Sequence, residues 1–406
     1  MADSLLLKQY NLILIRYAEI WLKSQKVKIR MLKYLMNNVK KILNRKGIHF
    51  NKYQISKDSS RVFFFFSNKD IPDAIRILTN AFGVHSISPA IRTSDNLKNI
   101  TERTVEIAND ILDKNDSFAL RVKRSGNHSY TSMEVAQIVG KAIIDKFPNL
   151  NLKVNLTQPK KQIFIEVRGE FTYIFSQVIK SKWGGLPIEP QKKMLVMDIG
   201  RLNDLTAGFL LLRRGAEIYP ILIDIKEDEV DNKAWLSNWR EVSEYIPYSR
   251  FQLNIFKIHH ILKKVASNLE DDKYFCGICR LIRFELMSKI LNKPTFHFYE
   301  KIRASVDGIS LNCSSFCPDS IDLDSLANNS LNSKLPIFTP IIGFTKSKLE
   351  DLTLKISTKL KKVNYCPFKP INQEFDLENL KKIYENLKID KLLEESIEKG
   401  LEIKVF

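Results

Sequence analysis

The N-terminal part of this sequence lacks cysteine and, over a long stretch, acidic residues. No aspartate or glutamate occurs between Glu19 and Asp58, and no cysteine occurs before Cys276. All five cysteines therefore lie in the C-terminal part of the chain. This distribution argues against a disulfide scaffold and favours a metal, cluster or redox use of the thiols.

Long apolar runs are also absent. No stretch approaches the roughly 20 apolar residues that a membrane-spanning helix requires. The first residues, Met1-Ala2-Asp3-Ser4, have neither the basic segment nor the small-residue cleavage site of a secretory signal. We therefore expect a cytoplasmic protein with no membrane partner. The 44% hydrophobic and 10% aromatic content is that of a folded chain, and 406 residues predict two or three domains.

Positive charge is concentrated in the first 185 residues. They hold 31 lysines and arginines against 15 acidic residues, whereas residues 186–406 hold 33 against 31. Nine of the basic residues fall between Lys23 and Lys46. A single basic run is as typical of a solvated helix face as of a binding surface. An excess confined to one half of the chain instead favours a polyanionic partner, and we expect nucleic acid.

The alternation of apolar residues predicts two small α+β domains in this basic half. Expected strands are 11–15, 61–66, 118–123, 153–156, 162–167 and 173–178, and expected helices are 26–43, 71–82, 99–112 and 133–147. We place the first domain, of ferredoxin-like kind, at residues 1–70 and the second at 71–185. The segment Gly184-Gly185-Leu186-Pro187 is typical of a linker.

The rhythm changes after the linker, where short apolar strands alternate with helices. Expected strands are 194–197, 218–224, 251–257 and 295–299, and expected helices are 205–214, 235–245, 258–265 and 279–291. This order predicts a Rossmann-like α/β domain with a parallel sheet, residues 186–366, followed by a helical tail, residues 367–406.

Basic residues of the first half are the expected RNA contacts. They are Lys23, Lys26, Lys28, Arg121, Lys123, Arg124, Lys160, Lys161, Arg168, Lys180 and Lys182. Such side chains contact phosphates and supply affinity without sequence readout. The sequence contains no recognition helix with base-reading side chains, which favours a folded RNA that is recognised by its shape.

Several segments resemble the tRNA 4-thiouridine synthetases. LIRYAEIWLK at 14–23 is similar to the family's VRYGEIxLKG, and FGVHSISPA at 82–90 is similar to its FGIxxxSPA. Residues 118–124, 131–134 and IKSKWGGLP at 179–187 resemble its THUMP domain. The resemblance spans nearly the whole chain in the family's order of ferredoxin-like, THUMP and PP-loop ATP-pyrophosphatase domains.

This resemblance implies a partner, a reaction and cofactors. The family binds tRNA through the acceptor stem and 3′ end. It adenylates uridine 8 with ATP and Mg²⁺ and delivers sulfur from a cysteine persulfide to give 4-thiouridine. A cysteine desulfurase or another sulfur donor is the implied second partner. By the same resemblance, the nucleotide contacts are Met197, Asp198, Ile199, Gly200, Arg201, Leu222, Ile223, Arg280, Tyr299 and Gly308.

The phosphate loop departs from the family's SGGxDS pattern. Aligned on Ala207-Gly208, its six positions hold the residues Ile-Gly-Arg-Leu-Asn-Asp of 199–204, so only Gly200 is kept. Asp204 is an acid placed where a phosphate would sit, although Arg201 at the helix N-terminus is an alternative source of positive charge. In the segment that matches the family's TGExxGQxxSQT, only Glu300 is kept, and Tyr299 replaces a glycine.

Cysteines 276 and 279 keep the family's CxxCR signature. By the resemblance, Cys276 and Cys279 are the catalytic sulfur carriers and Arg280 contacts the nucleotide. We expect Cys279 to open a helix, where the dipole favours a thiolate. An alternative is a zinc or iron–sulfur site, with Cys366 as third ligand or with Cys313 and Cys317. A further alternative is that the cysteines are buried and inert.

Three functions remain open at this point. They are a tRNA sulfurtransferase, a relative that binds tRNA without nucleotide chemistry, and a tRNA-binding protein with a zinc or iron–sulfur centre. The altered loop favours the second, and the retained cysteine pair favours the first or third. A homodimer is one of the oligomeric states that the sequence leaves open.

Overall fold

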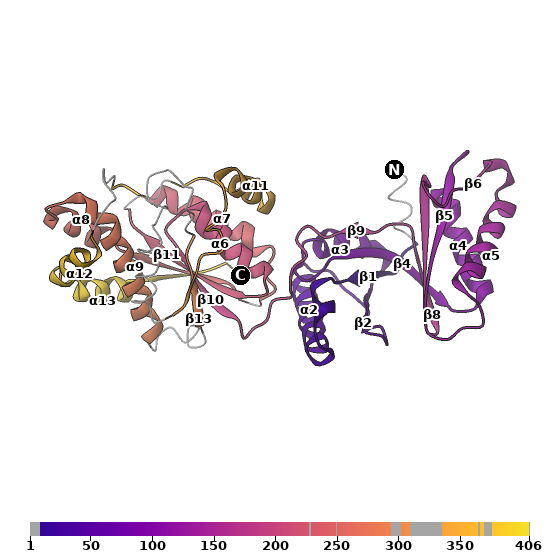
Figure 1. The fold of residues 1–406 in the computed structure, drawn as a ribbon, viewed down its shortest axis with the longest axis horizontal. Coiled ribbons are helices and arrows are strands. Elements are labelled where there is room, and N and C mark those ends of the chain that lie inside the picture. Colours follow the sequence, from indigo (N-terminus) through magenta and orange to yellow (C-terminus); the bar gives the residue numbers. More distant parts are fainter. Residues whose placement is uncertain are drawn as a thin grey trace. The chain divides into compact units, whose positions relative to one another are not determined.

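The computed structural model describes residues 9–226, 229–248, 250–293, 302–308, 335–363, 366–368 and 376–405. The chain divides into two compact units, here called unit 1 (Met1–Pro187) and unit 2 (Ile188–Phe406) (Figure 1). The segment expected to be a linker therefore ends unit 1.

Unit 1 is built on one nine-stranded sheet in the order β2-β3-β1-β4-β8-β7-β5-β6, with β9 also paired to β4. Its strands are β1 (Leu12–Arg16), β2 (Lys52–Ile55), β3 (Val62–Phe65), β4 (Ser86–Ser94), β5 (Ser117–Ser125), β6 (Lys153–Val154), β7 (Lys161–Arg168), β8 (Phe171–Phe175) and β9 (Ile179–Lys180). The first half of β4 pairs with β1 and its last four residues pair with β8. One strand therefore joins two lobes, where the sequence predicted two small α+β domains.

Helices cover the sheet of unit 1. They are α2 (Gln25–Arg45) and α3 (Ile71–Leu78) in the first lobe, and α4 (Leu97–Ile111) and α5 (Ser132–Lys146) in the second. In α2 the buried side chains recur every three or four residues, at Leu32, Leu35 and Val39, which confirms the predicted amphipathic helix. Thr131 caps α5 in a reciprocal pair with Glu134, since each side chain accepts from the other's backbone N–H.

The sequence pattern does not predict β4, although this strand is central to unit 1. Its sequence, SISPAIRTS, has no apolar–polar alternation and contains Pro89, which lies opposite Ile13 in the ladder. Serine and proline are depleted in strands, so tertiary pairing on both sides, and not local propensity, makes this segment extended.

Unit 2 has a six-stranded sheet in the order β14-β13-β10-β11-β12-β15. Its strands are β10 (Lys193–Asp198), β11 (Glu217–Asp224), β12 (Gln252–Lys257), β13 (Ile302–Val306), β14 (Ile337–Phe338) and β15 (Leu401–Lys404). All neighbours are parallel except β12 and β15. The predicted Rossmann-like parallel sheet is confirmed, whereas the strand expected at 295–299 lies outside the described residues.

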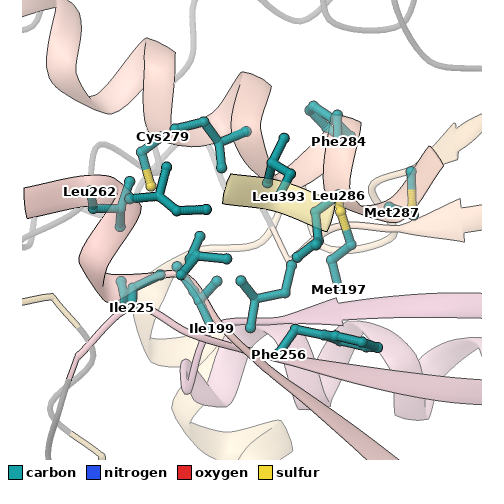
Figure 2. Packing of buried hydrophobic residues seen from close by; sticks show 14 of the residues in the cluster. Met197, Ile199, Ile225, Phe256, Leu262, Cys279, Phe284, Leu286, Met287 and Leu393 are labelled. Atoms are coloured by element: carbon teal, nitrogen blue, oxygen red, sulfur yellow. The ribbon is translucent and has the colours of Figure 1, made fainter. Parts of the chain in front are cut away.

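Helices lie on both faces of this sheet. They are α6 (Leu202–Arg213), α7 (Glu229–Ser243), α8 (His259–Asn268), α9 (Phe275–Asn292), α11 (Lys346–Ile356), α12 (Leu377–Asn386) and α13 (Asp390–Glu398). Figure 1 shows α6, α7 and α11 on one side and α8, α9, α12 and α13 on the other. Apolar side chains of the sheet, α8, α9 and α13 form one large buried cluster, part of which Figure 2 shows.

The C-terminal segment, expected to be helical, contains a strand as well. Helices α12 and α13 are separated by Lys388, whose φ of 44° is left-handed and interrupts the helix. The chain then returns to the sheet as β15, which runs antiparallel to β12. In the described part of the chain, no helix is both long and apolar enough to cross a membrane.

Candidate functional site

Two neighbouring parallel strands of unit 2, β10 and β13, end side by side at the carboxyl edge of the sheet. Strands β11 and β12 lie on one side of β10, and β13 and β14 lie on the other, so the chain order reverses at this point. Open α/β sheets bind their ligands at such a reversal. Residues 199–204 after β10 and residues 307–308 after β13 therefore occupy the expected ligand position.

The loop after β10 follows the backbone course of a phosphate loop. Gly200 adopts a left-handed φ of 98°, and its N–H donates to Asp198 Oδ1 at 2.7 Å. Helix α6 begins two residues later, at Leu202. Strand, glycine turn and helix N-terminus thus follow one another as the sequence predicts.

Two arginines and two aspartates form a buried ion network at this loop. Arg201 Nη2 donates to Asp204 Oδ1 at 2.5 Å and to Asp307 Oδ1 at 3.2 Å. Arg280 Nη2 donates to Asp307 Oδ2 at 3.2 Å. Burial pushes the pKa of Asp307 upward, but the guanidinium groups of Arg280 and Arg201 outweigh it and hold the pKa below its ordinary value. Both carboxylates are therefore neutralised from within the chain.

A third buried carboxylate, that of Asp198 at the end of β10, stabilises the loop. Trp235 Nε1 and Trp239 Nε1, both on α7, donate to Asp198 Oδ2 at 2.9 and 2.6 Å. Burial and the nearby Asp204 carboxylate raise the pKa of Asp198 to about 7. The carboxylate therefore ties α7 to the end of β10.

The structure brings most of the predicted nucleotide contacts to one place. Asp198, Ile199, Gly200, Arg201, Arg280 and Gly308 lie at the ends of β10 and β13 or reach them from α9. The side chains of Met197, Leu222 and Ile223 are buried in the core of unit 2. Tyr299 and Glu300 lie outside the described residues.

The cysteine pair lies on α9. This helix begins at Phe275, so Cys276 is in its first turn and Cys279 is one turn further along. The expectation that Cys279 opens the helix is wrong, because the 3₁₀ turn at Asp272–Tyr274 leads directly into α9. Cys279 is 7% exposed and packs among apolar side chains, with Leu262 beside it in Figure 2.

The described cysteines do not form a metal site. Cys276 and Cys366 are half-buried against the same apolar cluster as Cys279, and none of the three is in a disulfide. Cys366 Sγ donates to the carbonyl of Phe368 at 2.9 Å. Among the described residues, no three His, Cys, Asp or Glu side chains are grouped to hold a metal ion. The alternative ligands Cys313 and Cys317 lie outside these residues.

Unit 1 contains an open pocket of about 520 Å³, here called the basic pocket. It is lined by Tyr17, Trp21, Asp58, Ser60, Arg61, Lys123, Arg124, Ser125 and Arg168, which come from both lobes. Three predicted RNA contacts, Lys123, Arg124 and Arg168, therefore meet at one place. Trp21 is 57% exposed, and Lys28 Nζ lies 4.0 Å from the centre of its indole ring.

A buried glutamate organises the floor of the basic pocket. Glu166 forms ion pairs with Arg16, Arg61 and Arg168 at 3.2, 3.2 and 2.8 Å. Arg168 also pairs with Asp58 at 2.8 Å. Burial raises the pKa of Glu166, but the three guanidinium groups outweigh it, so its pKa lies below the ordinary value. With Lys123 and Arg124 at the rim, cations outnumber anions in this pocket.

Four residues of the basic pocket and its floor were not among the predicted RNA contacts: Arg16, Tyr17, Trp21 and Arg61. The first three lie in the segment LIRYAEIWLK, which carried the family resemblance but in which only Lys23 received an RNA-binding assignment. Arg61 directly precedes β3, and it lines the pocket where β7 brings Glu166 and Arg168 close to it.

The other predicted RNA contacts are dispersed over unit 1. Lys23 and Lys26 are exposed at the start of α2, Lys180 and Lys182 are exposed in and after β9, and Lys161 is half-buried in β7. Arg121 donates to Gln162 and to the carbonyl of Leu156, and Lys160 donates to Asp116 at 2.5 Å. These two side chains are held by the protein's own acceptors.

Family models match three consecutive parts of the chain. The ThiI ferredoxin-like domain matches residues 12–88, the THUMP domain matches residues 94–177, and the thiamine biosynthesis protein (ThiI) model matches residues 191–389. This is the domain order expected from the sequence.

Curated relatives and solved structures agree with this order. A probable tRNA sulfurtransferase of Methanosarcina mazei is 28% identical over 366 residues, covering 86% of this chain and 84% of the relative. One from Saccharolobus islandicus is 28% identical over 396 residues, covering 95% and 98%. The crystal structure of a 4-thiouridine synthetase–RNA complex with bound ATP has a TM-score of 0.77 at 19% identity, covering 98% of this chain and 100% of that chain. The crystal structure of PH1313 from Pyrococcus horikoshii has a TM-score of 0.64 at 21% identity, covering 85% and 99%.

Proposed function

Because this chain belongs to the ThiI family, as its three consecutive domain matches indicate, we propose that it binds tRNA through unit 1 and serves tRNA sulfur transfer. The names of the curated relatives and the RNA in the matched complex support this proposal. The observation that carries it in this chain is the basic pocket, where cations and exposed aromatic surface meet.

The side chains of the basic pocket suit an RNA end or loop. Lys123 and Arg124 are exposed and can each contact a phosphate, which supplies affinity that falls with salt. Trp21 offers an exposed indole face on which an unpaired base can stack. Arg61 and Arg168 keep the floor of the pocket positive while Glu166 fixes their positions.

The binding proposal is tested with the whole chain and unmodified tRNA at several salt concentrations. We expect steep weakening with salt, and we expect Lys123→Ala with Arg124→Ala to lower the slope of log K against log salt by about 1 to 2. The control is Lys98→Ala, an exposed lysine on α4 outside the pocket. We also expect residues 1–187, one compact unit, to keep tRNA affinity. Loss of all binding in that fragment would contradict the assignment to unit 1.

For sulfur transfer we propose Cys276 and Cys279 as the sulfur-carrying pair. Residues three apart on a helix are neighbours on one face, so both thiols lie on the same side of α9. One thiol would carry sulfur as a persulfide, and the other would form a disulfide with it when the sulfur is released. The more accessible Cys276 is the one that a sulfur donor, such as a cysteine desulfurase, would reach.

Two measurements test the cysteine proposal. Metal and sulfide analysis of anaerobically purified protein, repeated on Cys276→Ala, shows whether the pair holds zinc or an iron–sulfur cluster. Since no three ligands are grouped in the described part of the chain, we expect the variant to leave the metal content unchanged. Cys276→Ala should abolish the loading of sulfur from a persulfide donor onto the chain while leaving tRNA affinity unchanged, and this readout does not require ATP. If this variant alters neither sulfur loading nor metal content, the functional assignment of the pair fails.

ATP with Mg²⁺ is the cofactor that the family resemblance implies, and the matched synthetase has ATP bound. In this chain the described loop residues do not fit the phosphates. The carboxylate of Asp204 occupies the helix N-terminus, and Arg201 is paired with Asp204 and Asp307. We therefore assign no step of the reaction to ATP here.

The ion network favours a second candidate function, a relative that binds tRNA without nucleotide chemistry. The two candidates differ in product: incubation with unmodified tRNA, a persulfide donor and ATP yields 4-thiouridine only for the sulfurtransferase. Product formed in the presence of ATP and not in its absence would establish nucleotide-dependent chemistry. Tight tRNA binding without product would establish the second candidate.

A further inference from the structure

The described loop of unit 2 already holds an anion, and that anion belongs to the protein. Asp204 lies in the first turn of α6, a 12-residue helix, and is completely buried. Its Oδ2 accepts the backbone N–H of Ile199 at 3.2 Å. Backbone N–H groups and a helix N-terminus are the groups with which a phosphate loop binds a phosphate. Here they bind a carboxylate five residues along the same chain.

The positive charge beside this carboxylate is already neutralised. Arg201 Nε lies 3.1 and 3.0 Å from the two oxygens of Asp204, and Nη2 lies 2.5 Å from Oδ1. The same guanidinium and that of Arg280 hold the two oxygens of Asp307 at 3.2 Å. These four side chains are at most 9% exposed. A third buried arginine, Arg283, lies near enough to Asp307 to help lower its pKa. Arg201, the cation of the loop itself, already donates to both carboxylates of the chain.

The space between Asp204 and the backbone after β13 is also filled. A Cβ added at Gly308 would lie 2.4 Å from Asp204 Oδ1 and 2.5 Å from the Asp204 backbone nitrogen. Asp204 therefore packs directly against the backbone that follows β13. The Asp204 side chain therefore occupies space between the ends of β10 and β13.

We propose that the Asp204 carboxylate substitutes for a nucleotide phosphate in this loop, so that the loop is closed by the chain's own ion pairs and takes up no nucleotide phosphate. Arg201 and Arg280 then act as structural cations that join the ends of β10 and β13 to α9. This inference concerns the nucleotide step alone and does not depend on tRNA binding by unit 1.

The test compares wild type with Asp204→Ser, which opens the position of the carboxylate, and uses inorganic pyrophosphate as the probe. We expect millimolar pyrophosphate, or ATP with Mg²⁺, to leave the thermal unfolding midpoint of the wild type unchanged. The same pyrophosphate should raise the midpoint of Asp204→Ser by several degrees, because Arg201 and the helix N-terminus then face an empty anion position. Asp351→Ser, at an exposed position on α11, is the control and should not respond.

Two results would overturn the proposal. The first is stabilisation of the wild type by pyrophosphate or micromolar binding of ATP in calorimetry. The second is an equal response, or none, in wild type and Asp204→Ser. If Asp204→Ser does not fold, Asp204→Asn keeps the shape and removes the charge, and the same comparison applies. Titration of each folded variant with tRNA separates the outcome from a failure of the binding proposal, since loop variants should leave tRNA affinity unchanged.

Discussion

Trp239 Nε1 donates a hydrogen bond to Asp198 Oδ2 over 2.6 Å inside unit 2. Trp235 reaches the same oxygen from the preceding turn of α7, and the other carboxylate oxygen accepts from Gly200. One buried acid therefore fixes a strand end, a glycine turn and a helix, and this arrangement leads to the first prediction.

Replacing Asp198 with Asn should flatten the pH dependence of stability. The pKa of Asp198 is about 7 in the folded chain, against roughly 4 in an unfolded one. The folded state thus holds an extra proton between these values. The stability from this group is fully present below about pH 4 and is lost as the pH rises through about 7, at about 1.4 kcal/mol per pH unit. Urea unfolding of both proteins between pH 4 and 7 measures the difference, and equal slopes would contradict the prediction.

Gly308→Ala should destabilise unit 2. The new Cβ would lie 2.6 Å from the Cα of Asp204, which is backbone and cannot swing away. We expect a loss of about 1 to 3 kcal/mol in the free energy of unfolding, as for other overpacked sites. Gly343→Ala is the matched control, because a Cβ there meets no atom within 4 Å. Similar unfolding midpoints for the two variants would show that the loop yields easily.

Arg201→Met should cost far more than breaking a surface ion pair. Removal of the guanidinium leaves the buried carboxylates of Asp204 and Asp307 with less compensation, and such losses are typically about 3 to 5 kcal/mol. Arg250→Met is the control, since its pair with Glu402 is 46% and 40% exposed and should contribute at most about 1 kcal/mol. Chemical denaturation measures the free energy of unfolding of both variants. Comparable losses would contradict a stabilising role of the ion network.

Trp21→Ala should weaken tRNA binding without altering its salt dependence. A stacked base contributes about 1 to 3 kcal/mol, so the affinity should fall by about 5- to 150-fold. Leu22→Ala is the neighbouring control, because Leu22 is 86% exposed and does not line the basic pocket. Trp21→Phe should recover part of the affinity. Equal affinities for Trp21→Ala and Leu22→Ala would show that the indole of Trp21 does not contact the tRNA.

Local sequence patterns predicted the elements whose burial follows a simple period. The helix expected at 26–43 is α2, and the strand at 194–197 followed by the helix at 205–214 is β10 with α6. Strands β2, β4, β9, β13, β14 and β15 were missed. Of these, β4 is extended through pairing on both sides, and β15 is a mostly exposed edge of mixed polarity. In β4 and β15, the local sequence alone does not indicate a strand.

The candidate site could be predicted only in part, because some of its contacts join residues that are far apart in the sequence. Asp204 could be identified as an acid at a phosphate position from the loop alone. Its network could not, because Arg201 and Asp307 are 106 residues apart and meet only where β13 pairs with β10. The role of Arg201 as an internal cation, and not a phosphate ligand, follows from that pairing.

The shared strand β4 has a consequence for how tRNA is selected. Since β4 belongs to the hydrogen-bonded ladders of both lobes, backbone geometry sets the span between Arg61 in one lobe and Lys123 in the other. Side-chain substitutions can change how strongly each lobe binds a phosphate, but they do not change the distance that the backbone sets between the two lobes. For the tRNA binding proposed for unit 1, the backbone around β4 therefore sets the distance between the phosphates that the two lobes contact, and the side chains set the strength of each contact.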